Sequence, residues 1–170
     1  MNIRRWIVYG ALIVIAAILA WRWWPNDVRR VERQMNELFE LVGKSGPESL
    51  PVSAARSLEA GSHLASNVVL KLGEPFPTSM RRSETVTLLQ QARMRAEKIA
   101  VKNRGHEVAI QDNGSIWYDV TLEASVTYQG QQEDIIGSYR FVWAKGDDTW
   151  KIIQADALDV IQHPSGQAAW

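Results

Sequence analysis

The sequence of 170 residues contains no cysteine. Disulfides, thiolate metal sites and thiol nucleophiles are therefore excluded. The three histidines His63, His106 and His163 lack the close spacing of metal ligands, and each is interpreted as a surface or capping residue. A glycine-rich phosphate loop is also missing, because Gly105 and Gly114 have the surroundings of turn glycines. We predict neither a metal nor a cofactor.

Net charge is absent as well, since 19 Lys and Arg balance 19 Asp and Glu. Non-specific binding to nucleic acid usually needs a basic surface, so we expect no nucleic-acid partner. The balance conceals a local excess of cations, which could meet anionic headgroups or an acidic protein surface. A solvated helix face is the alternative interpretation. We call these residues the basic cluster: Arg81, Arg82, Arg93, Arg95, Lys98, Lys102 and Arg104.

A long apolar run lies near the N-terminus, between Trp6 and Trp24. As a helix it would span about 28 Å, close to the hydrocarbon thickness of a bilayer. Arginine and tryptophan flank it, as at a membrane interface. We predict that residues 1–25 form a short basic leader and a single transmembrane anchor, which binds the lipid bilayer. A cleaved signal peptide is the alternative, but bulky tryptophans stand where a cleavage site needs small residues.

Two sequence signals bear on the side of the membrane on which the domain lies, and they disagree. A short basic leader before an apolar run is the usual arrangement of a signal anchor, and it places the domain outside. Four arginines lie on the C-terminal side of the uncharged stretch that ends at Trp21, and they favour the opposite orientation by the positive-inside rule: Arg22, Arg29, Arg30 and Arg33. We predict a single-pass protein of the bacterial inner membrane, with its domain in the periplasm or another extracytoplasmic space.

The residues after the anchor predict a layer of helices. Apolar side chains recur every three or four positions over residues 27–42, which is typical of an amphipathic helix. A second helix is predicted from near Pro51, with a stripe of small residues that permits close packing. A short strand over residues 67–72 precedes a third helix, which is predicted over residues 83–99.

The period of the apolar pattern then changes to two, as in β-strands. A strand over residues 106–111 leads into a turn at residues 112–114, and a long strand with one apolar face starts at Ile116. The last two strands form a hairpin within residues 135–156, joined by a polar turn at residues 145–149. The order of elements predicts an α+β fold with a curved antiparallel sheet.

The final hairpin is similar to that of the nuclear transport factor 2-like superfamily, where a turn is followed by a tryptophan, a basic residue and β-branched residues. Residues 149–153 (TWKII) carry this motif, after a strand over residues 137–143. The order of elements resembles the same superfamily, which implies a cone-shaped α+β domain with helices packed on a curved sheet. We therefore predict such a domain over residues 26–163 and a flexible tail over residues 164–170.

Enzymes of this superfamily, such as ketosteroid isomerase and scytalone dehydratase, work inside the cone with an Asp base and Tyr donors, or with a His–Asp pair. The resemblance makes Tyr118, Tyr139 and Asp156 the pocket candidates in this chain. For Asp156 we favour a cross-strand ion pair with Arg140 over the role of a base. Asp119 is expected on a solvated strand face. No residue is assigned as catalytic.

Two hypotheses for the function follow. We favour a non-enzymatic, membrane-anchored binding or assembly module, a subunit or accessory of a bacterial envelope complex that contacts another protein or a second copy. An anchor before such a domain resembles the bitopic assembly components of type IV secretion systems and actinobacterial membrane proteins associated with lipid importers. The alternative is a small-molecule-binding protein, or an isomerase or dehydratase, that uses the cone pocket. A filled cone would argue against this alternative.

Overall fold

The computed structural model describes residues 27–72, 77–146 and 149–162, without the side chains of residues 160–162. The predicted anchor between Trp6 and Trp24 and the predicted tail over residues 164–170 lie outside this part. Within it, no helix has the length and apolar character needed to cross a membrane.

Three helices are described, α2, α3 and α4. Helix α2 buries Val31, Met35 and Leu38, so its apolar stripe faces the interior as its sequence predicts. Helix α3 starts with a proline in its first turn, where the missing N–H costs nothing. Their bounds are Asp27–Val42 for α2, Leu50–Ser62 for α3 and Arg82–Arg95 for α4.

Six strands form one sheet in the order β2-β1-β6-β5-β4-β3. All neighbouring strands are antiparallel except β1 and β6, which are parallel. The β5–β6 and β4–β5 pairs run almost the full length of their strands, and the β5–β6 pair is the hairpin that the final motif predicts. The bounds are Leu64–Lys71 (β1), Ser79–Arg81 (β2), Lys98–Ile110 (β3), Ile116–Tyr128 (β4), Gln131–Gly146 (β5) and Thr149–Gln162 (β6).

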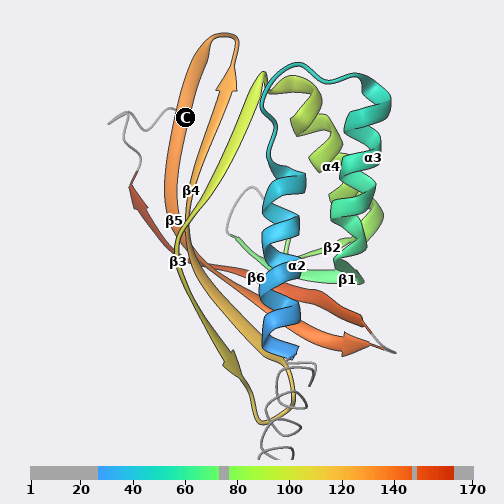
Figure 1. Ribbon diagram of the computed structural model, residues 1–170, viewed down its shortest axis with the longest axis vertical. Coiled ribbons are helices and arrows are strands. Elements are labelled where there is room, and N and C mark those ends of the chain that lie inside the picture. Colours follow the sequence, from blue (N-terminus) through green and yellow to red (C-terminus); the bar gives the residue numbers. More distant parts are fainter. Residues whose placement is uncertain (1–26, 73–76, 147–148, 163–170) are drawn as a thin grey trace, which may run out of the picture.

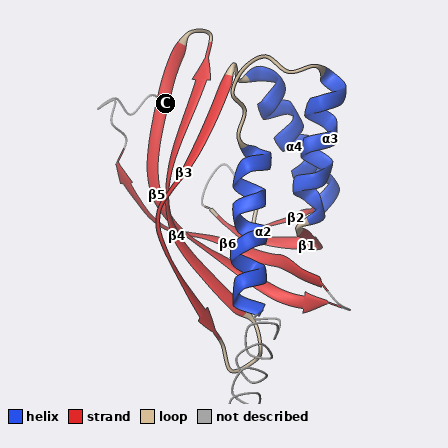
Figure 2. Ribbon diagram, viewed as in Figure 1, coloured by secondary structure: helices blue, strands red, loops and turns tan. Residues whose placement is uncertain are grey.

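The long strands bend strongly, and α2 runs along the inner, concave side of the sheet (Figure 1). Helices α3 and α4 lie beside each other, farther along towards β1 and β2 (Figure 2). The core is the volume between α2 and the concave face, where Met35, Tyr118 and Trp143 are fully buried. The predicted α+β fold, with helices packed on a curved sheet, is confirmed.

Two tight turns set the register of the long strands. Gly114 has a φ of +78° in the β3–β4 turn, a conformation that glycine adopts without steric cost. Gln129 and Gly130 both have positive φ, +51° and +75°, between the paired residues Tyr128 and Gln131. This two-residue loop of the I′ kind matches the right-handed twist of the strands.

The helix predicted over residues 83–99 is shorter in the structure. Helix α4 ends at Arg95, and β3 begins at Lys98, opposite Thr127 of β4. Ile99 fits a helical spacing in sequence, but it also fits the alternating pattern of a strand. Backbone pairing with β4 decides between the two, because a ladder of this length outweighs a weak local preference.

The start of α2 is attached to the last hairpin. Trp150 Nε1 donates a hydrogen bond of 3.1 Å to the carboxylate of Asp27, and Lys145 Nζ lies 3.6 Å from the same group. Trp150 itself is buried at the core. The first described residue therefore has a fixed position relative to β6.

Candidate binding site

The interior of the cone is packed with the protein's own side chains. Tyr118 and Trp143 have no exposed surface, and Trp150 is only 4% exposed. Tyr139 projects from β5 onto the same concave side, where it packs against this core. Its hydroxyl lies close above Gly137, where an added Cβ would be 2.9 Å from it. The two tyrosines that the sequence proposes as pocket residues therefore help to fill the cone.

A polar network lies at the edge of this core, between α2 and β3. Asn103 accepts a hydrogen bond from Gly105 N through Oδ1, at 2.9 Å, which fixes the orientation of its amide. Its Nδ2 faces the Tyr118 hydroxyl at 3.2 Å and Nδ1 of His106 at 3.1 Å. Nε2 of His106 is 3.6 Å from the carboxylate of Glu32. The bulge between Asn103 and Gly105 in β3 brings these groups together.

The network leaves little capacity for proton abstraction. Because an amide nitrogen only donates, Nδ1 of His106 must accept, and the proton of the neutral ring sits on Nε2 towards Glu32. The ring also stacks on Tyr118, with centroids 5.0 Å apart. Burial raises the pKa of Tyr118 to about 12, so its hydroxyl stays neutral. Sequence reasoning missed this cluster because Glu32, on α2, is far from the other residues along the chain.

Asp156 faces away from the cone. It lies opposite Arg140 in the register of β5 and β6, and Arg140 lies opposite Asp119 on β4. Since neighbours in a strand point to opposite faces, this row is on the outer side of the sheet, whereas Tyr118 points inward. The expectation that Asp156 belongs to the pocket is therefore wrong.

The expected cross-strand charge pair involves a different carboxylate. Arg140 donates from Nε and Nη2 to both oxygens of Asp119, at 2.7 and 2.6 Å, and its guanidinium covers the ring of Trp117 at 4.0 Å. Asp156 accepts instead from Nε2 of Gln154, at 2.9 and 2.7 Å. Both Asp119 and Asp156 lie opposite Arg140 in neighbouring strands, so the alternation of side chains along a strand does not predict which of them forms the ion pair.

Arg93 is not a surface residue, so its assignment to an interaction patch is wrong. Its guanidinium is fully buried and donates to the carbonyls of Leu41, Val42 and Gly43 at the end of α2. Nη2 donates to both carboxylate oxygens of Glu48. These carbonyls lack partners within a helix and carry its negative dipole end, so a cation stabilises them.

The other members of the basic cluster are exposed, but they do not share one helix. Arg81, Arg82 and Arg95 lie in or next to α4, whereas Lys98, Lys102 and Arg104 lie on β3. Arg81 pairs with Glu84 at 2.8 Å, and Arg104 pairs with Glu123.

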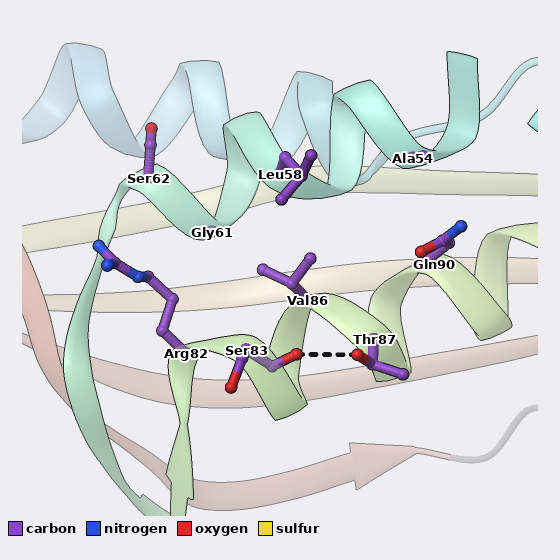
Figure 3. A pocket seen from close by; sticks show the side chains of 9 residues that line it. All are labelled: Ala54, Leu58, Gly61, Ser62, Arg82, Ser83, Val86, Thr87 and Gln90. Carbon is purple, nitrogen blue, oxygen red and sulfur yellow. Dashed lines mark hydrogen bonds between the residues drawn. The ribbon is translucent and has the colours of Figure 1, made fainter. Parts of the chain in front are cut away.

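A groove of about 580 Å³ lies between α3 and α4 (Figure 3). The helices are in close contact at Gly61, where an added Cβ would clash with Cγ2 of Val86. Leu58 points from α3 towards Val86, and its residue is 64% exposed. The stripe of small residues predicted on α3 therefore corresponds to a close helix contact with an apolar groove beside it.

Polar side chains surround the apolar part of this groove. Arg82 reaches from the start of α4 towards Ser62, and Gln90 points towards Ala54 farther along (Figure 3). Thr87 Oγ1 donates to the backbone oxygen of Ser83 at 2.9 Å, so its hydroxyl is already engaged. The groove is lined by Ala54, Leu58, Gly61, Ser62, Arg82, Ser83, Val86, Thr87 and Gln90.

Acidic residues and histidines do not gather into a metal site in residues 27–72, 77–146 and 149–162. Two carboxylates have a shifted pKa, Glu84 and Asp134, and in both the pKa is lowered. Hydrogen bonds from Arg81 lower the pKa of Glu84, and the hydroxyl of Ser125 lowers the pKa of Asp134. Both therefore stay ionised, unlike a carboxyl group tuned for acid–base work near neutral pH.

No family model and no curated protein matches the chain. Solved structures do resemble it. A candidate scytalone dehydratase from Novosphingobium aromaticivorans superposes with a TM-score of 0.64 at 13% identity, covering 84% of this chain and 95% of that one. A candidate dehydratase of the NTF2-like family from Streptomyces avermitilis gives 0.60 at 13% identity, covering 80% and 98%.

A candidate aromatic ring hydroxylase from Novosphingobium aromaticivorans superposes with a TM-score of 0.63 at 10% identity, covering 78% of this chain and 87% of that one. At such identities the likeness concerns the fold alone. The chain has the nuclear transport factor 2-like fold that its final hairpin resembles.

Proposed function

We propose that this chain is a small-molecule-binding protein that takes its ligand in the groove between α3 and α4, at a membrane to which residues 6–24 attach it. The observation that carries this proposal is the groove itself, whose middle is apolar and whose ends are polar. Sites for small molecules usually combine an apolar lining with a few polar groups in this way, and 580 Å³ lies within their usual range of volumes.

Structures of similar fold include two candidate dehydratases, which supports a small-molecule ligand over a purely structural role. The site differs from the one expected by resemblance. The cone interior is occupied by Tyr118 and Trp143, and Asp156 lies on the opposite face of the sheet. An isomerase or dehydratase mechanism inside the cone would therefore lack both space and the expected base.

Photolabelling tests the proposal with the full-length chain in lipid nanodiscs. The probe is decanol carrying a photoreactive diazirine near its methyl end, and mass spectrometry maps the labelled residues. We expect labels within Leu50–Ser62 and Arg82–Arg95, and at least fivefold weaker labelling of these helices in Leu58→Asp. Leu50→Asp is the matched control, because Leu50 is 55% exposed on the same helix but does not line the groove. Equal labelling of both variants would refute the proposal.

A second candidate function is the assembly module, favoured by the cations of the basic cluster that stay exposed. Arg95 and Lys98 are both exposed, and neither pairs with another described residue in an ion pair. An acidic partner surface would complement them. Arg95→Glu combined with Lys98→Glu should then weaken co-purification of a stoichiometric membrane protein; unchanged co-purification would rule out this use of the cluster.

A further inference from the structure

We infer that the α3–α4 groove takes a single-chain anionic amphiphile, with the alkyl chain along the apolar middle and the carboxylate at Arg82. This inference rests on the proposed function, because it assumes that the groove binds a ligand at all. It adds the chemical class of that ligand and its orientation.

Arg82 is the charged residue that lines the groove. Its guanidinium forms no hydrogen bond or ion pair with another described residue, whereas the guanidinium of Arg81 next to it is held by Glu84 through Nε at 2.9 Å and Nη2 at 2.8 Å. The stem of Arg82 passes over Gly61, where its Cγ lies 3.8 Å from the position of an added Cβ. The guanidinium is thus placed at the end of the apolar surface and has its donors free for a ligand.

The surroundings of Arg82 favour an anion. None of the nine lining residues is acidic, and the other polar ones are neutral Ser, Thr and Gln. Arg82 is also the first residue of α4, a helix of 14 residues whose N-terminal end carries a partial positive charge. Arginine binds carboxylates with two parallel hydrogen bonds, which gives it selectivity for a planar, charged headgroup.

The middle of the groove suits an alkyl chain. Ala54, Leu58 and Gly61 lie on one face of α3 at spacings of four and three, and Val86 of α4 faces them. From Ala54 to Gly61 the helix rises by about 10 Å, which sets the length of the apolar strip. Gln90 closes the far end with an uncharged group. A narrow strip with one cation at one end matches a linear tail with one charged head.

The same chemistry could be presented by free molecules or by the anionic surface of a bilayer, and the groove favours free molecules. A bilayer surface would need cations spread over a wide area. Here Arg81 is neutralised by Glu84, Arg93 is buried, the exposed Arg95 lies at the opposite end of α4, and Arg82 is the single cation among the residues that line the groove. We therefore assign the site to a dispersed, single-chain carboxylate.

The test uses three diazirine probes with the same ten-carbon chain and different headgroups: the carboxylate, the alcohol and the amine. Full-length protein in zwitterionic nanodiscs is labelled with each, and labels in α3 and α4 are counted by mass spectrometry. We expect the carboxylate to label the groove about tenfold more efficiently than the alcohol, and the amine less than the alcohol. Arg82→Gln should remove the preference for the carboxylate, and Arg95→Gln, on the same helix but outside the groove, should keep it.

Each outcome separates the inference from the proposed function. If all three probes label the groove equally and Leu58→Asp still weakens labelling at least fivefold, the groove binds ligands but the assignment to anions is wrong. If no probe labels α3 or α4, both fail. The same labelling is repeated in nanodiscs that contain anionic lipid. If the carboxylate probe no longer labels the groove there, headgroups of the bilayer occupy Arg82, and the assignment to a dispersed ligand is overturned.

Discussion

Arg93 and Glu48 form a bidentate ion pair, with Nη2 2.6 and 2.7 Å from the two carboxylate oxygens. Arg93 comes from α4 and is fully buried, and Glu48 comes from the loop between α2 and α3. The same guanidinium caps the last carbonyls of α2. Lys44 Nζ in turn caps the end of α4, because it donates to Arg93 O at 2.7 Å and to Ala96 O at 2.5 Å. Arg93 of α4 thus caps the end of α2, and Lys44, two residues after α2, caps the end of α4.

Arg93→Met should lower the free energy of unfolding by about 3–5 kcal/mol, because it uncaps α2 and leaves the carboxylate of Glu48 only the longer ion pair with Arg56, at 3.6 Å. Urea unfolding followed by tryptophan fluorescence measures the loss. Arg95→Met, an exposed neighbour on the same helix, should change it by less than about 0.5 kcal/mol. Adding Glu48→Gln to Arg93→Met should restore part of the loss; strictly additive losses would contradict the coupling.

Gly61→Ala should destabilise the chain by about 1–3 kcal/mol, since the new methyl group meets Cγ2 of Val86 and the two helices must separate. Thermal unfolding measures the effect. Val86→Ala should rescue the variant, because it removes the clashing atom. Gly46→Ala has nothing within 4 Å of the added carbon, and it should leave the melting temperature nearly unchanged.

Stability should fall with acidification below pH 6.5 because of His63. Its residue is 7% exposed, and burial lowers its pKa from 6.5, an effect that Lys151 reinforces and that Glu37 and Glu59 oppose. Below pH 6.5 the unfolded chain therefore binds a proton that the folded chain does not, so the free energy of unfolding rises with pH in this window. Urea unfolding between pH 5 and pH 7.5 tests this, and His63→Gln should flatten that part of the curve.

Arg140→Lys should cost about 1–2 kcal/mol although the charge is kept. A lysine cannot donate two parallel hydrogen bonds to Asp119 or stack a planar group on Trp117. The control is Arg33→Lys, whose partner Glu37 lies 3.9 Å away in an exposed pair worth little. Equal stability of the two variants would show that the geometry of Arg140 contributes nothing.

Much of the fold could be predicted because its signals are local. The apolar stripe of α2, the turn at Gly114 and the alternation after Ile116 each require only neighbouring residues, and all are present in the structure. Ile99 could not be placed, because its spacing suits both a helix and a strand until β4 pairs with it. Likewise α3 buries Ser53 and Ser57 while Leu58 is exposed, which an apolar pattern does not predict.

The candidate site was harder to predict, because its parts are distant in sequence. Arg93 has the same surroundings in sequence as Arg95, yet one is buried and the other exposed. Only the position of Glu48 and the end of α2 distinguishes them. The groove depends on the closeness of α3 and α4, which the missing side chain of Gly61 permits but does not by itself specify. The side on which Asp156 faces is set by irregular register between β5 and β6.

The parallel pairing of β1 with β6 also determines when the domain can fold during synthesis. Leu70 and Lys71 pair with Ala155 and Asp156, so β1 has no inner neighbour until nearly the whole chain has left the ribosome. Helices α3 and α4 contact the sheet mainly through β1 and β2. The segment from Leu50 to Arg95 therefore cannot complete its packing until β6 has been synthesised, and its apolar groups stay exposed until then. A ribosome stalled before β6 would carry an open, aggregation-prone half-domain.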